Sequence, residues 1–150
     1  MSLTEQINAD LKSAMKNKER EKLDAIRAIK TAFTLAKTEK SGGAELTEDE
    51  ELKIVQKLVK QRKDSAEIYK GQGREDLYEK EMSEVEVISV YLPKQLSEEE
   101  LVGKLTEIIS KVGASGPQDM GKVMGVASKE LSGKAEGKLI AQKVKELLSK

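Results

Sequence analysis

Apolar side chains recur every three or four residues along almost the whole chain, which is the spacing of one face of an α-helix. The first stripe consists of Leu3, Ile7, Leu11 and Met15, with Ala14 beside them. Six further stripes follow, over residues 23–36, 52–69, 78–88, 101–112, 120–131 and 139–148. No two segments form a recognisable pair of strands. The spacing therefore predicts an all-α protein.

Capping residues and glycines divide these stripes into separate helices. Thr47 and Ser97 each stand three residues before a Glu, and this capping-box pattern predicts that helices start there. The Ser-Gly-Gly sequence at 41–43 predicts a loop, and Gly71 and Gly73 predict the end of the third helix. Together these signals indicate about four helices in the first two thirds of the chain and three shorter ones after them.

The segment 85–92 is rich in β-branched residues and has the propensity of a strand. We nevertheless predict a helix there, because no second strand is available to pair with it. Pro93 ends that helix, and residues 93–96 form the best candidate linker. The predicted organisation is an N-terminal helical bundle over 1–93 and a small three-helix tail domain over 97–150.

The composition excludes several classes of chemistry. The 150 residues include no Cys and no His, so a thiol nucleophile, an imidazole base and a Cys/His zinc site are impossible. The acidic residues Glu81, Glu84 and Glu86 are best interpreted as a solvated or ion-paired helix face. No glycine-rich phosphate loop of a known pattern occurs. We predict no catalytic residue, no metal site and no cofactor, and we leave open whether the chain belongs to an enzyme.

Neither a secretory signal nor an apolar stretch of the ~18–20 residues needed to cross a membrane is recognisable. From this we expect a cytoplasmic protein that does not contact a membrane.

Positive charge and glycine are concentrated at the C-terminal end of the chain. Residues 101–150 contain nine Lys against five acidic residues, a net charge of +4 in a chain whose total is zero. Seven of the eleven Gly also lie there, and Gly121 and Gly125 are inside a helical stripe, where Gly costs roughly 0.5–1 kcal/mol relative to Ala.

Two interpretations are open for these residues. The lysines could form an ordinary solvated face, and the glycines could permit contacts between helices. Alternatively, this end of the chain approaches a nucleic-acid backbone, because exposed amides and ammonium groups together suit phosphate. The candidate nucleic-acid-binding residues are Lys122, Lys129, Lys134, Lys138, Lys143, Gly121, Gly125, Gly133 and Gly137.

Several separated motifs, in order along the chain, resemble those of the YqeY family. They are the segments 61–66, 73–77, 91–93, 119–125 and 133–137, together with Glu81 and Glu84. The family is similar to the helical and tail regions of the B subunit of the tRNA-dependent amidotransferase. That resemblance implies a helical bundle followed by a three-helix tail which contacts tRNA.

The same resemblance associates the chain with carbon–nitrogen ligase activity that uses glutamine as the amide donor, but the catalytic domain of that enzyme has no counterpart here. The chain also departs from the family pattern at Glu136, where Asp is expected as the cap of the last helix. Glu is a weaker cap, so the shape of the 133–137 turn is expected to differ in detail.

Taken together, the residues and the resemblance predict a tRNA-binding module without catalytic activity of its own. Its expected partners are tRNA and either amidotransferase subunits or another protein. The alternative is a protein-interaction module that docks a basic partner through the acidic residues of 75–100.

Overall fold

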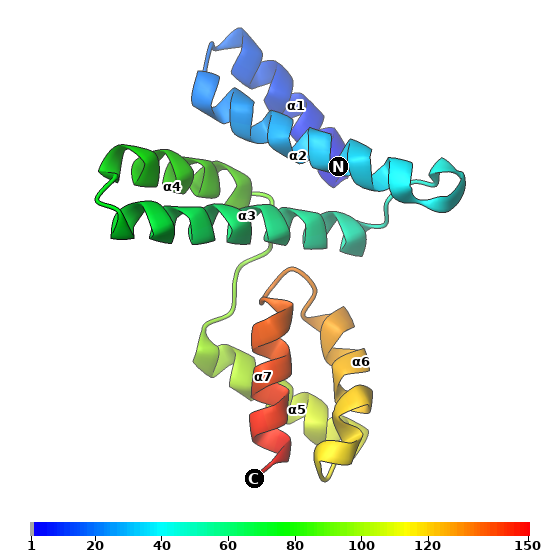
Figure 1. Ribbon diagram of the computed structural model, residues 1–150. Helices are drawn as coiled ribbons and strands as arrows, with labels where there is room; N and C mark the ends of the chain where they lie inside the picture. Colours follow the sequence, from blue (N-terminus) through cyan, green and yellow to red (C-terminus); the bar gives the residue numbers. More distant parts are fainter. Residues whose placement is uncertain (1) are drawn as a thin grey trace. The chain divides into compact units, whose positions relative to one another are not determined.

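The computed structural model describes residues 2–150, which form seven α-helices and two short 3-10 segments and contain no strand (Figure 1). The prediction of an all-α protein is therefore confirmed. The helices fall into two compact units, Met1–Leu92 and Pro93–Lys150. Each unit has its own apolar core, and the two cores share no residue.

The first unit is built from two helical hairpins (Figure 1). The first hairpin consists of α1 (Leu3–Lys16) and α2 (Arg20–Glu39), and the second of α3 (Glu48–Gly71) and α4 (Glu75–Ser89). A 3-10 segment, η1 (Ser41–Gly43), follows α2. Helix α2 packs on both α3 and α4, so the core lies between the hairpins. Its most deeply buried large side chains are Ile7, Ile26, Ile29, Val55 and Ile88.

The capping boxes predicted from the sequence are present. The Thr47 hydroxyl accepts from the N–H of Glu50 at 3.2 Å, and the Glu50 carboxylate accepts from the N–H of Thr47 at 2.9 Å. Ser97 and Glu100 form the same pair of hydrogen bonds at the start of α5 (Glu98–Val112), both at 3.1 Å. These bonds satisfy amides that a helix start otherwise leaves unpaired, which is why the helices begin at these residues.

The β-branched segment 85–92 is helical as far as Ser89, and Val85 and Ile88 face the core. The chain then turns so that Tyr91 is also buried, with an exposed fraction of 6%. The Tyr91 hydroxyl donates to the Asp10 carboxylate at 2.6 Å. This bond ties the end of α4 to α1. The prediction of helix rather than strand is confirmed, because burial on one helical face outweighs strand propensity.

Alkaline pH should weaken the first unit through Tyr91. Burial raises the pKa of this phenol well above its ordinary value, and the hydrogen bond to the charged Asp10 raises it further. The folded chain therefore keeps a proton that the unfolded chain releases above about pH 10. This contribution to stability is complete below that pH and is lost as the pH rises toward the raised pKa. The unfolding free energy of the wild type should fall more steeply above pH ~10 than that of Tyr91→Phe.

Met15 lies outside the core, contrary to the sequence prediction, with 54% of its surface exposed, whereas Ala14 is fully buried. A spacing of four residues advances about 40° around a helix at each step. Three such steps carry Met15 about 120° away from Leu3, while Ala14 returns to within about 20° of it. Position 14 therefore continues the buried stripe.

The second unit consists of α5, α6 (Met120–Glu130) and α7 (Gly137–Leu148), with a 3-10 segment, η2 (Pro117–Asp119), before α6. Its core contains Leu101, Leu105, Ile108, Val123, Ala127, Leu131, Ala135, Ile140, Val144 and Leu148.

The segment before α5 is fixed to the second unit. The Gln95 side-chain amide donates to the carbonyl of Gly133 at 2.6 Å, and the N–H of Leu96 donates to the carbonyl of Lys134 at 3.0 Å. The sequence placed both residues in a linker. The two hydrogen bonds instead make them part of the structure that holds the α6–α7 turn.

Candidate functional site

The two glycines of α6 lie on its solvent-exposed side. A Cβ atom built on Gly121 or Gly125 would meet nothing within 4 Å in the structure described, apart from the helix's own nearby backbone. Contact between helices of the second unit therefore does not explain why glycine stands at these two positions. Both residues have ordinary helical backbone, so a positive φ does not explain them either.

Lys122 and Lys129 are also exposed on α6. Within the described residues 2–150, neither forms an ion pair. Lys122 lies close enough to Asp119 to contribute to the low pKa of that carboxyl, although the N–H of Ser115, which donates to it at 2.9 Å, is the larger cause. The ammonium groups of both lysines are therefore available to a partner.

A second group of candidate residues surrounds the start of α7. Lys134 lies in the turn before the helix, and Gly137 and Lys138 are its first two residues; all three are exposed. Within the part of the chain that the structure describes, the Glu136 side chain makes no capping hydrogen bond to the first turn of α7. That agrees with the expectation that Glu is a weaker cap than Asp at this position.

The remaining two candidate residues have roles within the fold. Lys143 has a side chain that is only 18% exposed, and it forms ion pairs with Glu98 at 3.9 Å and Glu146 at 3.6 Å. Gly133 is buried and has φ +76, a conformation that favours glycine, and its carbonyl accepts from Gln95. Neither residue needs an external partner to account for it.

The acidic residues of 75–100 are divided between the two units. Glu84 lies 3.5 Å from Arg62 in a largely buried ion pair between α4 and α3. The three glutamates at 98–100 belong to the second unit, where they occupy the first turn of α5. Charge that is consecutive in sequence is thus divided between two units and partly neutralised.

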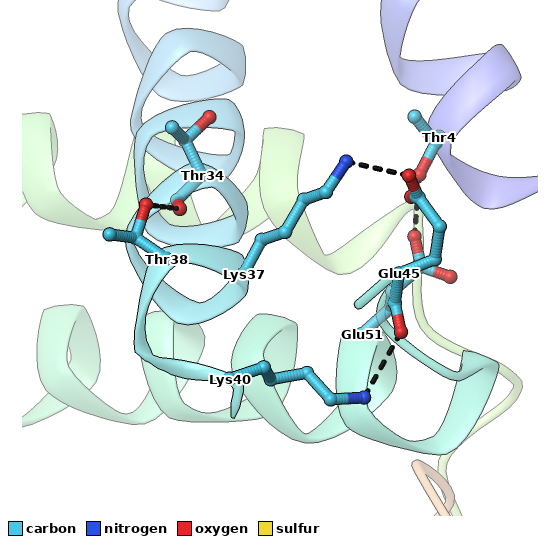
Figure 2. A network of polar contacts seen from close by, with 7 residues as sticks. All are labelled: Thr4, Thr34, Lys37, Thr38, Lys40, Glu45 and Glu51. Atoms are coloured by element: carbon cyan, nitrogen blue, oxygen red, sulfur yellow. Dashed lines mark hydrogen bonds and ion pairs between the residues drawn. The ribbon is translucent and has the colours of Figure 1, made fainter. Parts of the chain in front are cut away.

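A feature that the sequence analysis missed is a cavity of about 530 Å³ in the first unit. It lies between the start of α1, the second half of α2, and the chain from Glu45 to Glu51. Figure 2 shows part of its wall, where the Thr4 hydroxyl donates to the Glu51 carboxylate at 2.6 Å. Glu51 is only 9% exposed, and no other charged residue among those that the structure describes is as deeply buried.

An ion pair lines part of this cavity. Lys37 lies 2.6 Å from the carboxylate of Glu45, and Lys40 donates to the carbonyl of Glu45 at 3.0 Å (Figure 2). Lys40 also donates to the carboxylate of Glu50 at 2.9 Å. The hydrogen bond from Lys40 is the largest cause of the lowered pKa of Glu50. These contacts hold the 3-10 segment and the start of α3 against the end of α2.

Among the described residues, no group of three or more His, Cys, Asp or Glu is arranged to hold a metal ion. Their helices also include none long and apolar enough to span a membrane.

The family model described as "Yqey-like protein" matches residues 4–148, nearly the whole chain. The chain belongs to this family. The resemblance inferred from the separated motifs is thereby confirmed.

Curated relatives of the chain are fungal proteins with the name "Altered inheritance of mitochondria protein 41, mitochondrial". The protein of Clavispora lusitaniae is 38% identical over 116 residues, which cover 76% of this chain and 66% of the relative. The protein of Pyrenophora tritici-repentis is 32% identical over 150 residues, which cover 95% of this chain and 78% of the relative. The protein of Candida glabrata is 34% identical over 114 residues, which cover 74% of this chain and 62% of the relative. The chain thus spans about two thirds of the length of these relatives.

These names contradict two of the predictions. They describe inheritance of mitochondria and mention neither tRNA nor an amidotransferase, so the predicted tRNA-binding function is wrong. The positive charge at the C-terminal end attracts any anionic surface and does not by itself distinguish a nucleic acid from a protein. The predicted cytoplasmic localisation is also contradicted, because the relatives are named as mitochondrial. Composition and the lack of a membrane span do not determine the compartment of a protein.

Proposed function

We propose that the chain is a protein-interaction module whose helix α6 docks on an acidic surface of a partner protein. The observation that carries this proposal is that two open glycines share one face of α6 beside two lysines, whereas the open Gly103 is the single glycine of α5. Gly125 lies in the middle of α6, where it costs roughly 0.5–1 kcal/mol relative to Ala, and no contact within the second unit compensates. Close approach of another molecule supplies a reason for glycine there.

The surroundings of the glycines indicate what kind of surface would approach. Gly121, Gly125 and Ser128 are spaced by four and three residues, so they share one face of the helix. Lys122 and Lys129 lie together along one side of that face, and neither is neutralised by an ion pair among residues 2–150. A helix or loop with carboxylates could lie against the glycines and pair with both ammonium groups. A basic surface would instead be repelled by these two lysines.

A protein fits this face better than a nucleic acid. Stacking on aromatic side chains is a main source of affinity for single strands, and all the aromatic residues lie at or before Tyr91, outside the second unit. The relatives' names speak of a process, the inheritance of mitochondria, rather than of a reaction. A module that joins other proteins would suit such a process.

Photo-crosslinking in cells tests the proposal. A benzophenone amino acid at Ser128 should give adducts with proteins, and these should survive nuclease treatment. Gly125→Leu should lower the adduct yield about tenfold, because the new side chain stands where the partner must approach. Lys122→Glu with Lys129→Glu should lower it similarly by repelling an acidic surface.

Gly103→Leu is the matched control, because Gly103 is an exposed glycine inside α5 with nothing within 4 Å of its Cβ position. It should leave the adducts unchanged. Circular dichroism should show that neither leucine variant loses helix. Adducts that disappear with nuclease, or that persist in Gly125→Leu, would contradict the proposal.

A further inference from the structure

The cavity of the first unit has the size of a small-molecule site. Its volume of about 530 Å³ falls within the range of ~300–1,000 Å³ typical of ligand pockets. Phe33, Leu46 and Ile7 supply apolar wall, and a few polar groups converge between them. Such a combination of apolar lining and few oriented polar groups is usual for sites that bind small ligands.

One side of the cavity presents acceptors without enough donors. Glu51 is 9% exposed, and the hydroxyl of Thr4 is the donor to its carboxylate. Asn8 stands four residues after Thr4 and therefore on the same face of α1. Its side-chain oxygen is buried and has no hydrogen-bond partner within the described part of the chain. Burying a carboxylate and an amide oxygen costs free energy unless donors reach them.

A cation without an acid partner lines the same cavity. Lys30 is half-buried on α2 and forms no ion pair with another residue in the range 2–150. The neighbouring Lys37 is different, because Glu45 neutralises it at 2.6 Å. The cavity wall thus holds a buried anion, Glu51, and a cation, Lys30, that are not paired with each other.

We propose that this cavity binds a free amino acid, with its ammonium group donating to Glu51 and Asn8 and its carboxylate accepting from Lys30. A protonated amine supplies up to three donors, which the acceptors of Glu51 and Asn8 lack. A carboxylate supplies the counter-charge that Lys30 lacks. A ligand that carries both groups can donate to Glu51 and Asn8 and neutralise Lys30 at the same time. This site lies in the first unit and is independent of the docking face on α6.

Titration of the full chain with the free amino acids, one at a time, tests the proposal by nuclear magnetic resonance. At least one of them should shift the amide signals of residues 4, 8, 30 and 51 at millimolar concentration. Its N-acetylated form, which lacks the ammonium group, should bind about tenfold or more weakly. The corresponding decarboxylated amine should also bind more weakly, because Lys30 then repels it.

Two substitutions separate binding from folding. Glu51→Gln keeps the volume of the side chain and removes its charge, so amino-acid affinity should fall about tenfold. Glu48→Gln is the matched control, because Glu48 is exposed in the first turn of α3 and does not line the cavity. The Glu48→Gln variant should bind the amino acid with the affinity of the wild type.

Asn8→Leu should abolish binding and yet raise the melting temperature, because it removes an acceptor that is buried without a partner. A merely structural Asn8 would instead lower the melting temperature when replaced. The proposal is overturned if no free amino acid shifts these signals, if the N-acetylated form binds equally well, or if Glu51→Gln leaves the affinity unchanged.

Discussion

Replacing Leu105 by Ala should unfold the second unit and leave the first one folded. Leu105 is fully buried in α5, at the centre of the apolar core of the second unit. Truncating a buried Leu to Ala removes about 2–5 kcal/mol of stability. A unit of about sixty residues buries a smaller share of its surface than a larger domain and has little stability to lose. The second unit should therefore be mostly unfolded at physiological temperature.

The distribution of tyrosines makes this result measurable. Tyr69, Tyr78 and Tyr91 all belong to the first unit, and the second unit has no aromatic residue. Near-ultraviolet circular dichroism therefore reports on the first unit, whereas far-ultraviolet circular dichroism reports on the helices of both. Leu105→Ala should reduce the far-ultraviolet signal and leave the near-ultraviolet signal at its wild-type value.

Leu35→Ala provides the control, because Leu35 is 60% exposed. Surface substitutions of this kind usually change stability by less than about 0.5 kcal/mol. If Leu105→Ala abolished both signals together, the two cores would be shown to fold as one cooperative unit.

Helices and their ends could be predicted from the sequence because the signals are local. A capping box such as that of Thr47 uses residues within one turn, so the pattern alone identifies the helix start. The buried stripe is also local, but its direction depends on an accurate helical period. Met15 was misplaced because a constant spacing of four residues drifts around the helix.

The sites could be predicted only in part. Gly121 and Gly125 stand out in sequence as costly residues inside a helix, but only the three-dimensional structure shows that no other helix of the second unit lies against them. The cavity could not be predicted, because Asn8, Lys30 and Glu51 come from three different helices. In sequence, Glu51 looks like one more acidic residue at the start of a helix, where the dipole already explains it.

The chemical nature of the partner could not be predicted from charge. A net charge of +4 at one end of the chain sets the sign of the attraction and leaves the identity of the anion open. The resemblance assigned that anion to tRNA, and the names of the relatives do not bear this out. The shape of the glycine face on α6 says more about the partner than the charge does, because it is a place where another backbone can approach the helix closely.

Breaking the ion pair between Arg62 and Glu84 should destabilise the first unit by about 1–3 kcal/mol, less than the ~3–5 kcal/mol of a fully buried pair. Arg62 Nε lies 3.5 Å from Glu84 Oε2, and the side chains are only 17% and 19% exposed. Arg62 also donates from Nη1 to the carbonyl of Leu58 at 3.2 Å. Arg62→Met leaves the Glu84 carboxylate largely buried without its counter-charge. Urea unfolding followed through the tyrosine signal measures the loss.

A double-mutant cycle separates the pair from the side chains themselves. Once Arg62→Met has removed the cation, Glu84→Leu removes the uncompensated charge, so the double variant should be more stable than the sum of the single losses predicts. We expect a coupling energy of about 1 kcal/mol or more. Arg74 and Asp76 give the comparison, because they are closer, at 3.1 Å, but 55% and 66% exposed. Solvent screens such a pair, so its cycle should show no measurable coupling. If the exposed pair coupled as strongly as the buried one, distance rather than burial would govern the energy, and Arg62 would have no special role between α3 and α4.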